Sequence, residues 1–488
     1  MYEKSNLLRL TGRKMRSVAI AILPSFLQSF VSGVPSQSAK VSPTAWLDGM
    51  RGYAAFFVFL CHFELAYHRK GAFLYGTVED PNFPNENRYL LQLPIIRLIN
   101  NGPAMVCIFF VISGYALSLK SLKLMRRGSY DQLLHTLASS TFRRPFRLFL
   151  PCIASTLVIF VALRIGVFDY PNTIGEVEDV FRSIFLGWAH EPQPHIFPTF
   201  REQAWDYYRA SKGLFDIFTH ERWPAHGYDI HLWTIPVEFR CSLVLFLTLL
   251  GLSLMRTRTR LILLGLFIIC SFQFDVFELG LFWGGMFLAE LSLIKQDRTE
   301  LDGKIEEGLP LFKDKSNEHS RRDKVVSCGV FFISLLLLSC PPQKTEFAPF
   351  YSTLVKWSPP GLGAGEKNRF WEAIGAFLLI WTTNNNTDLQ RPFACALGRY
   401  LGNISFSIYL LHGFMNRTLG YSVVYNMWQH VTGKETLVRY EAGFTLGGLI
   451  LIPMTIWVSD IFWRYVDVPS VKFARWLEGQ VFAPKAGT

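Results

Sequence analysis

The segment from Trp46 to Tyr67 reads WLDGMRGYAAFFVFLCHFELAY, and its composition is typical of a helix inside a lipid bilayer. A bilayer core about 30 Å thick needs roughly 20 mostly apolar helical residues to cross it, which is the length of this segment. Uncharged apolar runs occur again at 261–274, 325–340 and 443–457. Such runs would be insoluble on the surface of a soluble protein, so the chain is predicted to be an all-α, polytopic membrane helical bundle.

The composition of the whole chain supports this fold class. Of its 488 residues 50% are hydrophobic and 18% are charged, with a formal net charge of +11. The basic residues lie beside the apolar segments, a pattern typical of flanks that face anionic membrane lipids, so no nucleic-acid partner is expected. The eight cysteines lie in or beside apolar segments without a CxxC pair, which indicates small buried side chains and no metal site.

Ten apolar segments predict about ten transmembrane helices. Their approximate bounds are 46–67, 103–119, 146–167, 231–255, 261–274, 276–294, 325–340, 370–384, 395–415 and 441–463. The pair at 261–294 requires a short hinge at Asp275.

Lysine and arginine in the short connections place both termini on the cytosolic side, because basic loops stay inside. The predicted domains are a cytosolic tail at 1–44, a membrane domain at 45–466, and a short cytosolic tail at 467–488. In the first tail the apolar run 17–31 favours an interfacial helix, and a cleaved signal peptide is the alternative. Within the membrane domain, 168–230 is expected to form an extracytosolic cap loop and 295–324 a charged, solvated cytosolic loop. The sequence does not distinguish an endomembrane from the plasma membrane.

The first span carries ionisable residues, which are costly in a membrane and therefore functional candidates. Arg51 and His62 are eleven residues apart, within about 20° of three full helical turns, so they share one face. Asp48 lies about 40° off that face. Imidazole is a suitable proton acceptor, and an arginine binds anionic groups such as phosphate. The alternative is that Asp48 and Arg51 anchor the helix at the interface and His62 is a hydrogen-bonded core residue.

Further polar residues open or line other spans. His231, Trp233 and Glu238 open the fourth span, where Glu238 either forms a structural ion pair or assists His62. Arg143, Arg144 and Arg147 open the third span, either as positive-inside anchors or as a cradle for phosphates. Ser113 in the second span permits close helix approach. Ser405, Tyr409 and His412 in the ninth span are ordinary interhelical hydrogen-bonding residues, or they line a site.

Five blocks together resemble the membrane-bound acyltransferase-3 family, and most closely its fungal members. The blocks are Leu47–Gly52 with His62, Phe109–Tyr115, Arg143–Pro151, His231–Glu238 and Leu401–His412. The fourth block departs from the family pattern at Thr234, Ile235 and Pro236, which leaves the local geometry around Glu238 open.

The resemblance implies ten transmembrane helices and an acyl-CoA co-substrate, usually acetyl-CoA, with no permanently bound cofactor. It also implies a hydroxyl acceptor on a carbohydrate, lipid or secondary metabolite. In the resulting hypothesis the donor phosphates lie near Arg51, Arg143, Arg144 and Arg147. His62 deprotonates the acceptor or carries the acyl group, and Glu238 or His412 orients it. A secondary transporter of a small anionic or acylated metabolite is the alternative function, since it too places charges inside a bundle.

Overall fold

The computed structural model describes residues 20–32, 42–68, 73–77, 88–175, 187, 191–218, 227–308 and 316–482. Over these residues the chain is helical and contains no strand. Parts of the expected N-terminal tail, cap loop, charged loop and C-terminal tail lie outside the described residues.

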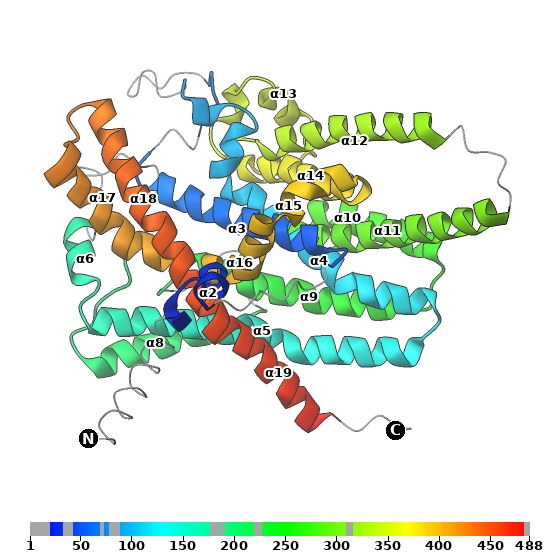
Figure 1. The fold of residues 1–488 in the computed structure, drawn as a ribbon, viewed down its shortest axis with the longest axis horizontal. Coiled ribbons are helices and arrows are strands. Elements are labelled where there is room, and N and C mark those ends of the chain that lie inside the picture. The colour runs from blue at the N-terminus through cyan, green and yellow to red at the C-terminus, as the bar shows by residue number, and fades with distance from the viewer. Residues whose placement is uncertain are drawn as a thin grey trace.

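Ten helices occupy the positions of the ten apolar segments, and most run side by side along one direction (Figure 1). They are α3 (Ala45–Leu65), α4 (Gly102–Arg126), α5 (Tyr130–Arg164), α9 (Thr234–Gly251), α10 (Thr257–Gln273), α11 (Phe277–Gly308), α12 (Ser316–Leu338), α14 (Ala364–Asn385), α16 (Ala396–Met415) and α18 (Leu437–Phe462). The hinge expected at Asp275 is present, because this residue separates α10 from α11 with a φ of 58°.

Within the described residues, five stretches are long and apolar enough to cross a membrane. These are 102–126, 130–164, 230–251, 277–299 and 437–481. The chain is therefore an all-helical protein with several apolar helices suited to a bilayer, and the number of ten spans stays a prediction.

Shorter helices fill the connections and both ends of the described chain. They are α2 (Ser25–Ser32), α6 (Asp169–Gly175), α8 (Phe200–Leu214), α13 (Tyr351–Lys356), α15 (Thr387–Ala394), α17 (Tyr421–Met427) and α19 (Val468–Val481). In the described part of 295–324 the backbone is helical, since α11 continues to Gly308 and α12 begins at Ser316, and the charged, solvated cytosolic character of this segment stays a prediction. The expected tail after residue 467 likewise begins with a helix, α19.

Two pairs of helices cross closely because glycines face their partners. A Cβ added to Gly52 of α3 would lie 2.4 Å from the backbone nitrogen of Gly402 in α16. A Cβ on Gly114 of α4 would lie 2.1 Å from the carbonyl oxygen of Phe282 in α11. Small residues let helix backbones approach where lipid supplies little hydrophobic driving force between helices. The first crossing fixes α3 against α16, the two helices that carry His62 and His412.

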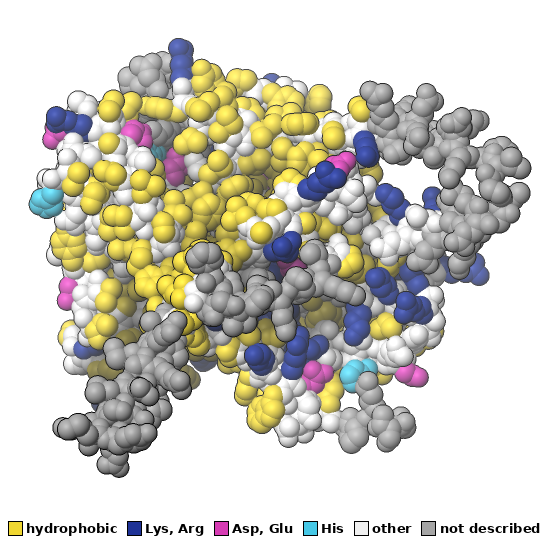
Figure 2. Space-filling view, in the orientation of Figure 1, with side chains coloured by type: hydrophobic (Ala, Val, Ile, Leu, Met, Phe, Trp, Pro, Cys, Tyr) yellow, Lys and Arg dark blue, Asp and Glu magenta, His cyan; other side chains and the backbone are white. Residues whose placement is uncertain are grey.

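The basic side chains gather at one end of the molecule. Figure 2 shows lysine and arginine concentrated at the end where α5, α11 and α19 project, whereas the opposite end, near α6 and α17, displays few. We call this end the basic face. On α3, Arg51 lies at the end nearer the basic face and His62 at the other end. The two predicted site residues of this helix therefore belong to different regions of the molecule.

Candidate active site

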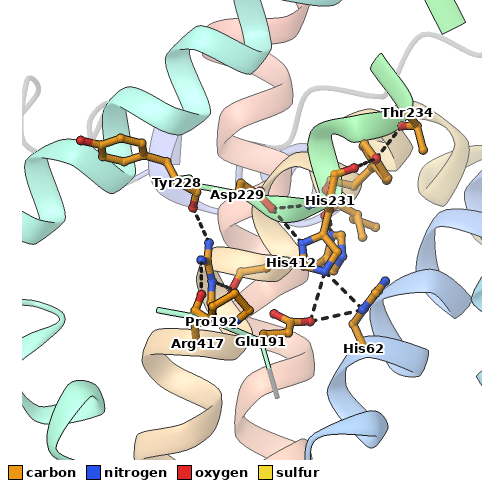
Figure 3. Close-up of polar contacts among 12 residues, drawn as sticks. His62, Glu191, Pro192, Tyr228, Asp229, His231, Thr234, His412 and Arg417 are labelled. Atoms are coloured by element: carbon orange, nitrogen blue, oxygen red, sulfur yellow. Dashed lines mark hydrogen bonds and ion pairs between the residues drawn. The ribbon is translucent and has the colours of Figure 1, made fainter. Parts of the chain in front are cut away.

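Three histidines from separate parts of the chain converge (Figure 3), at the end of α3 away from the basic face. His62 lies in the last turn of α3, His231 in the 3-10 turn Ile230–Trp233 that leads into α9, and His412 in the last turn of α16. The His231 ring centroid lies 4.2 Å from that of His62 and 4.4 Å from that of His412. We call these three residues the histidine cluster.

Glu191 joins two of the histidines. Its Oε1 atom lies 3.2 Å from His62 Nδ1 and 3.1 Å from His231 Nε2, and the two ring nitrogens are themselves 3.2 Å apart. A carboxylate is an acceptor only, so the nearby imidazole nitrogens donate to it. When His62 donates through Nδ1, its Nε2 is the nitrogen left to accept a proton.

Asp229 holds the other side of the His231 ring. Its Oδ1 atom lies 2.8 Å from His231 Nδ1 and accepts the backbone N–H of the same residue at 3.0 Å. Burial raises the pKa of the Glu191 carboxyl, but the charge and hydrogen bonds of His231 and His62 lower it more, so its pKa lies well below the usual value. Burial also raises the pKa of Asp229, and His231, Arg417 and His412 lower it to about 2. Both acids are therefore ionised at neutral pH.

Arg417 fixes the loops that carry these carboxylates. It is fully buried in the π-helical turn Asn416–Gly420 that continues α16. Its guanidinium donates to the carbonyl oxygens of Tyr228 at 2.7 Å and Pro192 at 3.2 Å, next to Asp229 and Glu191 (Figure 3). One arginine thus ties both loop segments to the helix of His412.

His412 has one engaged and one open ring nitrogen. Its Nδ1 atom lies 2.7 Å from the carbonyl oxygen of Tyr409 and donates to it, because a carbonyl only accepts. Its Nε2 atom is buried without a hydrogen-bond partner among the described residues. This nitrogen therefore carries a lone pair that no described group engages.

The cluster contains ligand types that bind divalent metals. One nitrogen from each of the three histidines lies within 4.8 Å of the others. In a tetrahedral zinc site with bonds of about 2.0 Å, ligand atoms lie only about 3.3 Å apart. His62 Nδ1 and His231 Nε2, 3.2 Å apart, come near that spacing, and the carboxylates of Glu191 and Asp229 also contact these imidazoles.

A second site is a cavity of about 160 Å³ on the side of the bundle toward the basic face. Arg51, Arg144 and Arg147 line it together with the acids Glu238 and Asp467 and several apolar side chains, and we call it the arginine cavity. The guanidinium of Arg144 is already hydrogen-bonded within the protein: it donates to Glu238 at 2.7 Å and to Ser242 at 3.0 Å. Ser113 also donates to Glu238, at 3.2 Å.

The remaining arginines differ in their availability. Arg51 donates to Ser405 at 3.1 Å and pairs with Asp48 at 3.4 Å. The side chain of Arg147 is exposed to the cavity and forms no hydrogen bond or ion pair with the described residues. Arg147 is therefore the arginine most available to an anionic ligand.

Tyr409 and Thr234 form the boundary between the two sites. Both line the arginine cavity, and their hydroxyl oxygens lie 2.5 Å apart. The Tyr409 hydroxyl also donates to the backbone carbonyl of His231, so it reaches the histidine cluster. Trp233 lies in the same 3-10 turn as His231, directly before α9. The Tyr409–Thr234 pair therefore lies between the arginine cavity and the histidine cluster.

Comparison with known proteins identifies the chain. The acyltransferase-3 model, described as an acyltransferase domain, matches residues 44–305. The O-acetyltransferase PaAT-1 of Phomopsis amygdali is 31% identical over 445 residues, covering 89% of this chain and 84% of that protein. The chain belongs to the acyltransferase-3 family. Acyltransferase clz18 of Cochliobolus lunatus is 28% identical, and the match covers 88% of this chain and 94% of that protein. No solved structure matches.

This membership makes the protein a membrane O-acyltransferase of fungal type and favours an enzyme over the transporter alternative. The structure also corrects the predicted positions of two site residues. Glu238 does not lie beside His62, since its partners are Arg144 and Ser113 in the arginine cavity. Arg143 does not line that cavity, because its side chain turns to Glu478 of α19 at 3.0 Å.

Three residues of the site were absent from the sequence-based prediction. Glu191, Asp229 and Arg417 lie in loops or in an irregular helical turn, where periodicity carries no information on neighbours. The loop 168–230 was expected to form a cap, and no motif in it singled out Glu191 or Asp229.

Proposed function

We propose that this acyltransferase moves an acetyl group from acetyl-CoA to a hydroxyl of a carbohydrate, lipid or secondary metabolite. The observation that supports the proposal most directly is the contact of His62 Nδ1 with Glu191, which leaves Nε2 as the proton acceptor. The name of PaAT-1, an O-acetyltransferase, favours acetyl among acyl groups.

The donor enters the arginine cavity from the basic face, which we assign to the cytosol because of its lysines and arginines. Arg147 and Arg51 bind the phosphates, since guanidinium groups match phosphate oxygens with paired hydrogen bonds. Glu238 keeps Arg144 in place rather than acting on the substrate. The pantetheine arm then passes Tyr409 and Thr234 toward His62.

At the histidine cluster His62 Nε2 takes the proton of the acceptor hydroxyl. The resulting oxygen nucleophile attacks the thioester carbonyl, so that a C–O bond forms and the C–S bond breaks. The proton then passes from His62 to the sulfur of the departing CoA. Glu191 orients His62 and stabilises its imidazolium form, as a carboxylate does for the histidine of a catalytic triad. In the alternative route His62 first accepts the acetyl group and then passes it to the acceptor.

The test is CoA release from acetyl-CoA in purified membranes with pooled sugar and lipid alcohols. We expect acceptor-dependent release by the wild type and none by His62→Ala at matched abundance. His430→Ala is the control, because His430 is exposed and remote in sequence from the cluster. Retained activity in His62→Ala would remove His62 from the mechanism.

A further inference from the structure

A groove opens near the basic face between α10, α11 and α14, and it shares no lining residue with the arginine cavity. Its walls come from the start of α10, the second half of α11 and the end of α14. The acyl-transfer mechanism above makes no use of it.

The rim of the groove is positively charged. Arg258 of α10 and Arg298 of α11 are exposed, and neither forms an ion pair or hydrogen bond in the part of the chain that the structure describes. Lys295 adds a third charge and donates to Asn385 at 3.0 Å.

The nearby acids are already neutralised by other arginines. Glu290 is fully buried and accepts from Arg260 at 2.7 Å and from Arg126 at 3.0 Å. Asp297 pairs with Arg126 as well. Among the side chains that the structure describes, the rim therefore keeps an uncompensated positive charge.

The floor of the groove is apolar. It consists of leucines and an isoleucine on α10 and α11 with one tryptophan on α14, namely Leu261, Leu288, Leu291, Ile294 and Trp381. One turn beyond Leu261 on the same face of α10 lies Gly265, where an added Cβ would meet no atom within 4 Å. The apolar surface of the floor thus continues along α10 to Gly265, where the space is open, beside the exposed side chains of Ile262 and Leu266.

We propose that this groove binds an anionic phospholipid of the leaflet at the basic face. The headgroup phosphate would lie against Arg258 and Arg298, and one acyl chain would run over Leu261 and past Gly265. Charge complementarity selects an anionic headgroup over a zwitterionic one. The apolar floor favours a lipid over a soluble anion, because only a lipid buries that surface.

The test measures binding to the full-length protein in detergent, by native mass spectrometry and by the unfolding temperature. The probes are phosphatidylserine, phosphatidylcholine and inorganic phosphate. We expect wild type to retain phosphatidylserine about tenfold better than phosphatidylcholine, and Arg258→Gln with Arg298→Gln to lose that preference. The matched control is Arg209→Gln with Arg439→Gln, two exposed arginines of α8 and α18, which should bind as wild type does.

A second variant tests the apolar part of the groove without removing a charge. Gly265→Leu fills the open space along α10 and should weaken phosphatidylserine retention. Inorganic phosphate should have no effect on that retention. Equal retention by the double arginine variant, equal binding of phosphatidylcholine, or competition by inorganic phosphate would each overturn the proposal. Because the readout is binding, it is independent of whether His62 carries out the transfer.

Discussion

His62 Nδ1 lies 3.2 Å from Oε1 of Glu191, a residue contributed by a loop far from α3 in the sequence. The carboxylate contacts only one of the two ring nitrogens, and the contact determines which nitrogen bears the proton. Catalytic histidines that act as bases depend on such a partner for their tautomer and orientation.

Glu191→Gln should lower kcat by about 10²- to 10⁴-fold, because an amide neither fixes the required tautomer nor stabilises the imidazolium. The KM for acetyl-CoA should change little, since the phosphate contacts lie in the separate arginine cavity. Steady-state kinetics at several acetyl-CoA concentrations separates the two parameters. Glu202→Gln, an exposed glutamate at the start of α8, is the matched control. A rise in KM at unchanged kcat would contradict the positioning role of Glu191.

Arg147→Gln should raise the KM for acetyl-CoA roughly 10- to 100-fold, which corresponds to the loss of one charge-assisted hydrogen bond. Arg143→Gln is the control four residues earlier on the same helix, because Arg143 faces Glu478 outside the cavity. We expect Arg143→Gln to keep the wild-type KM. If the two variants have the same KM, the donor phosphates do not bind in the arginine cavity.

The sequence predicted the helices far better than the site. Hydrophobic runs such as 46–67 locate α3 and the other long helices, because burial in lipid leaves a continuous apolar signal. Helical periodicity showed that Arg51 and His62 share a face of α3. It could not show that they serve two different sites at the two ends of that helix.

Helical periodicity could not predict the positions of residues outside regular helices. The positions of Glu191 and Asp229 depend on the path of a long connection, and that path is set by backbone contacts with Arg417. For Glu238 the sequence left two alternatives open, a structural ion pair and a role beside His62. The ion pair with Arg144 holds it in the arginine cavity. Tertiary contacts between distant loops leave no local pattern to detect.

Gly285→Ala should destabilise the protein, because a Cβ at this position of α11 would lie 2.2 Å from the carbonyl oxygen of Val111 in α4. Overpacking of this kind costs about 1–3 kcal/mol, since the two helices must separate. Gly329→Ala in α12 is the control, because its Cβ would meet no atom within 4 Å. Thermal unfolding in detergent should show a lower midpoint for Gly285→Ala only. Equal midpoints would mean that α4 and α11 do not cross as closely as described.

Removal of metal ions should leave acyl transfer intact. Each imidazole of the cluster has a protein partner: Glu191 for His62, Asp229 and Glu191 for His231, and the Tyr409 carbonyl for His412. These contacts supply the orientation that a metal would otherwise impose.

The measurement is CoA release before and after treatment with 1,10-phenanthroline, together with elemental analysis of the purified enzyme. We expect unchanged rates and less than one equivalent of any transition metal. Two results together would show that the histidines are metal ligands. The wild type would lose activity on treatment and regain it with zinc, and it would contain one equivalent of zinc that His412→Ala lacks. In that case His62 Nδ1 would hold the ion and Nε2 would keep its proton. His62 would then no longer be the base, and the bound ion would instead activate the hydroxyl of the acceptor as the nucleophile.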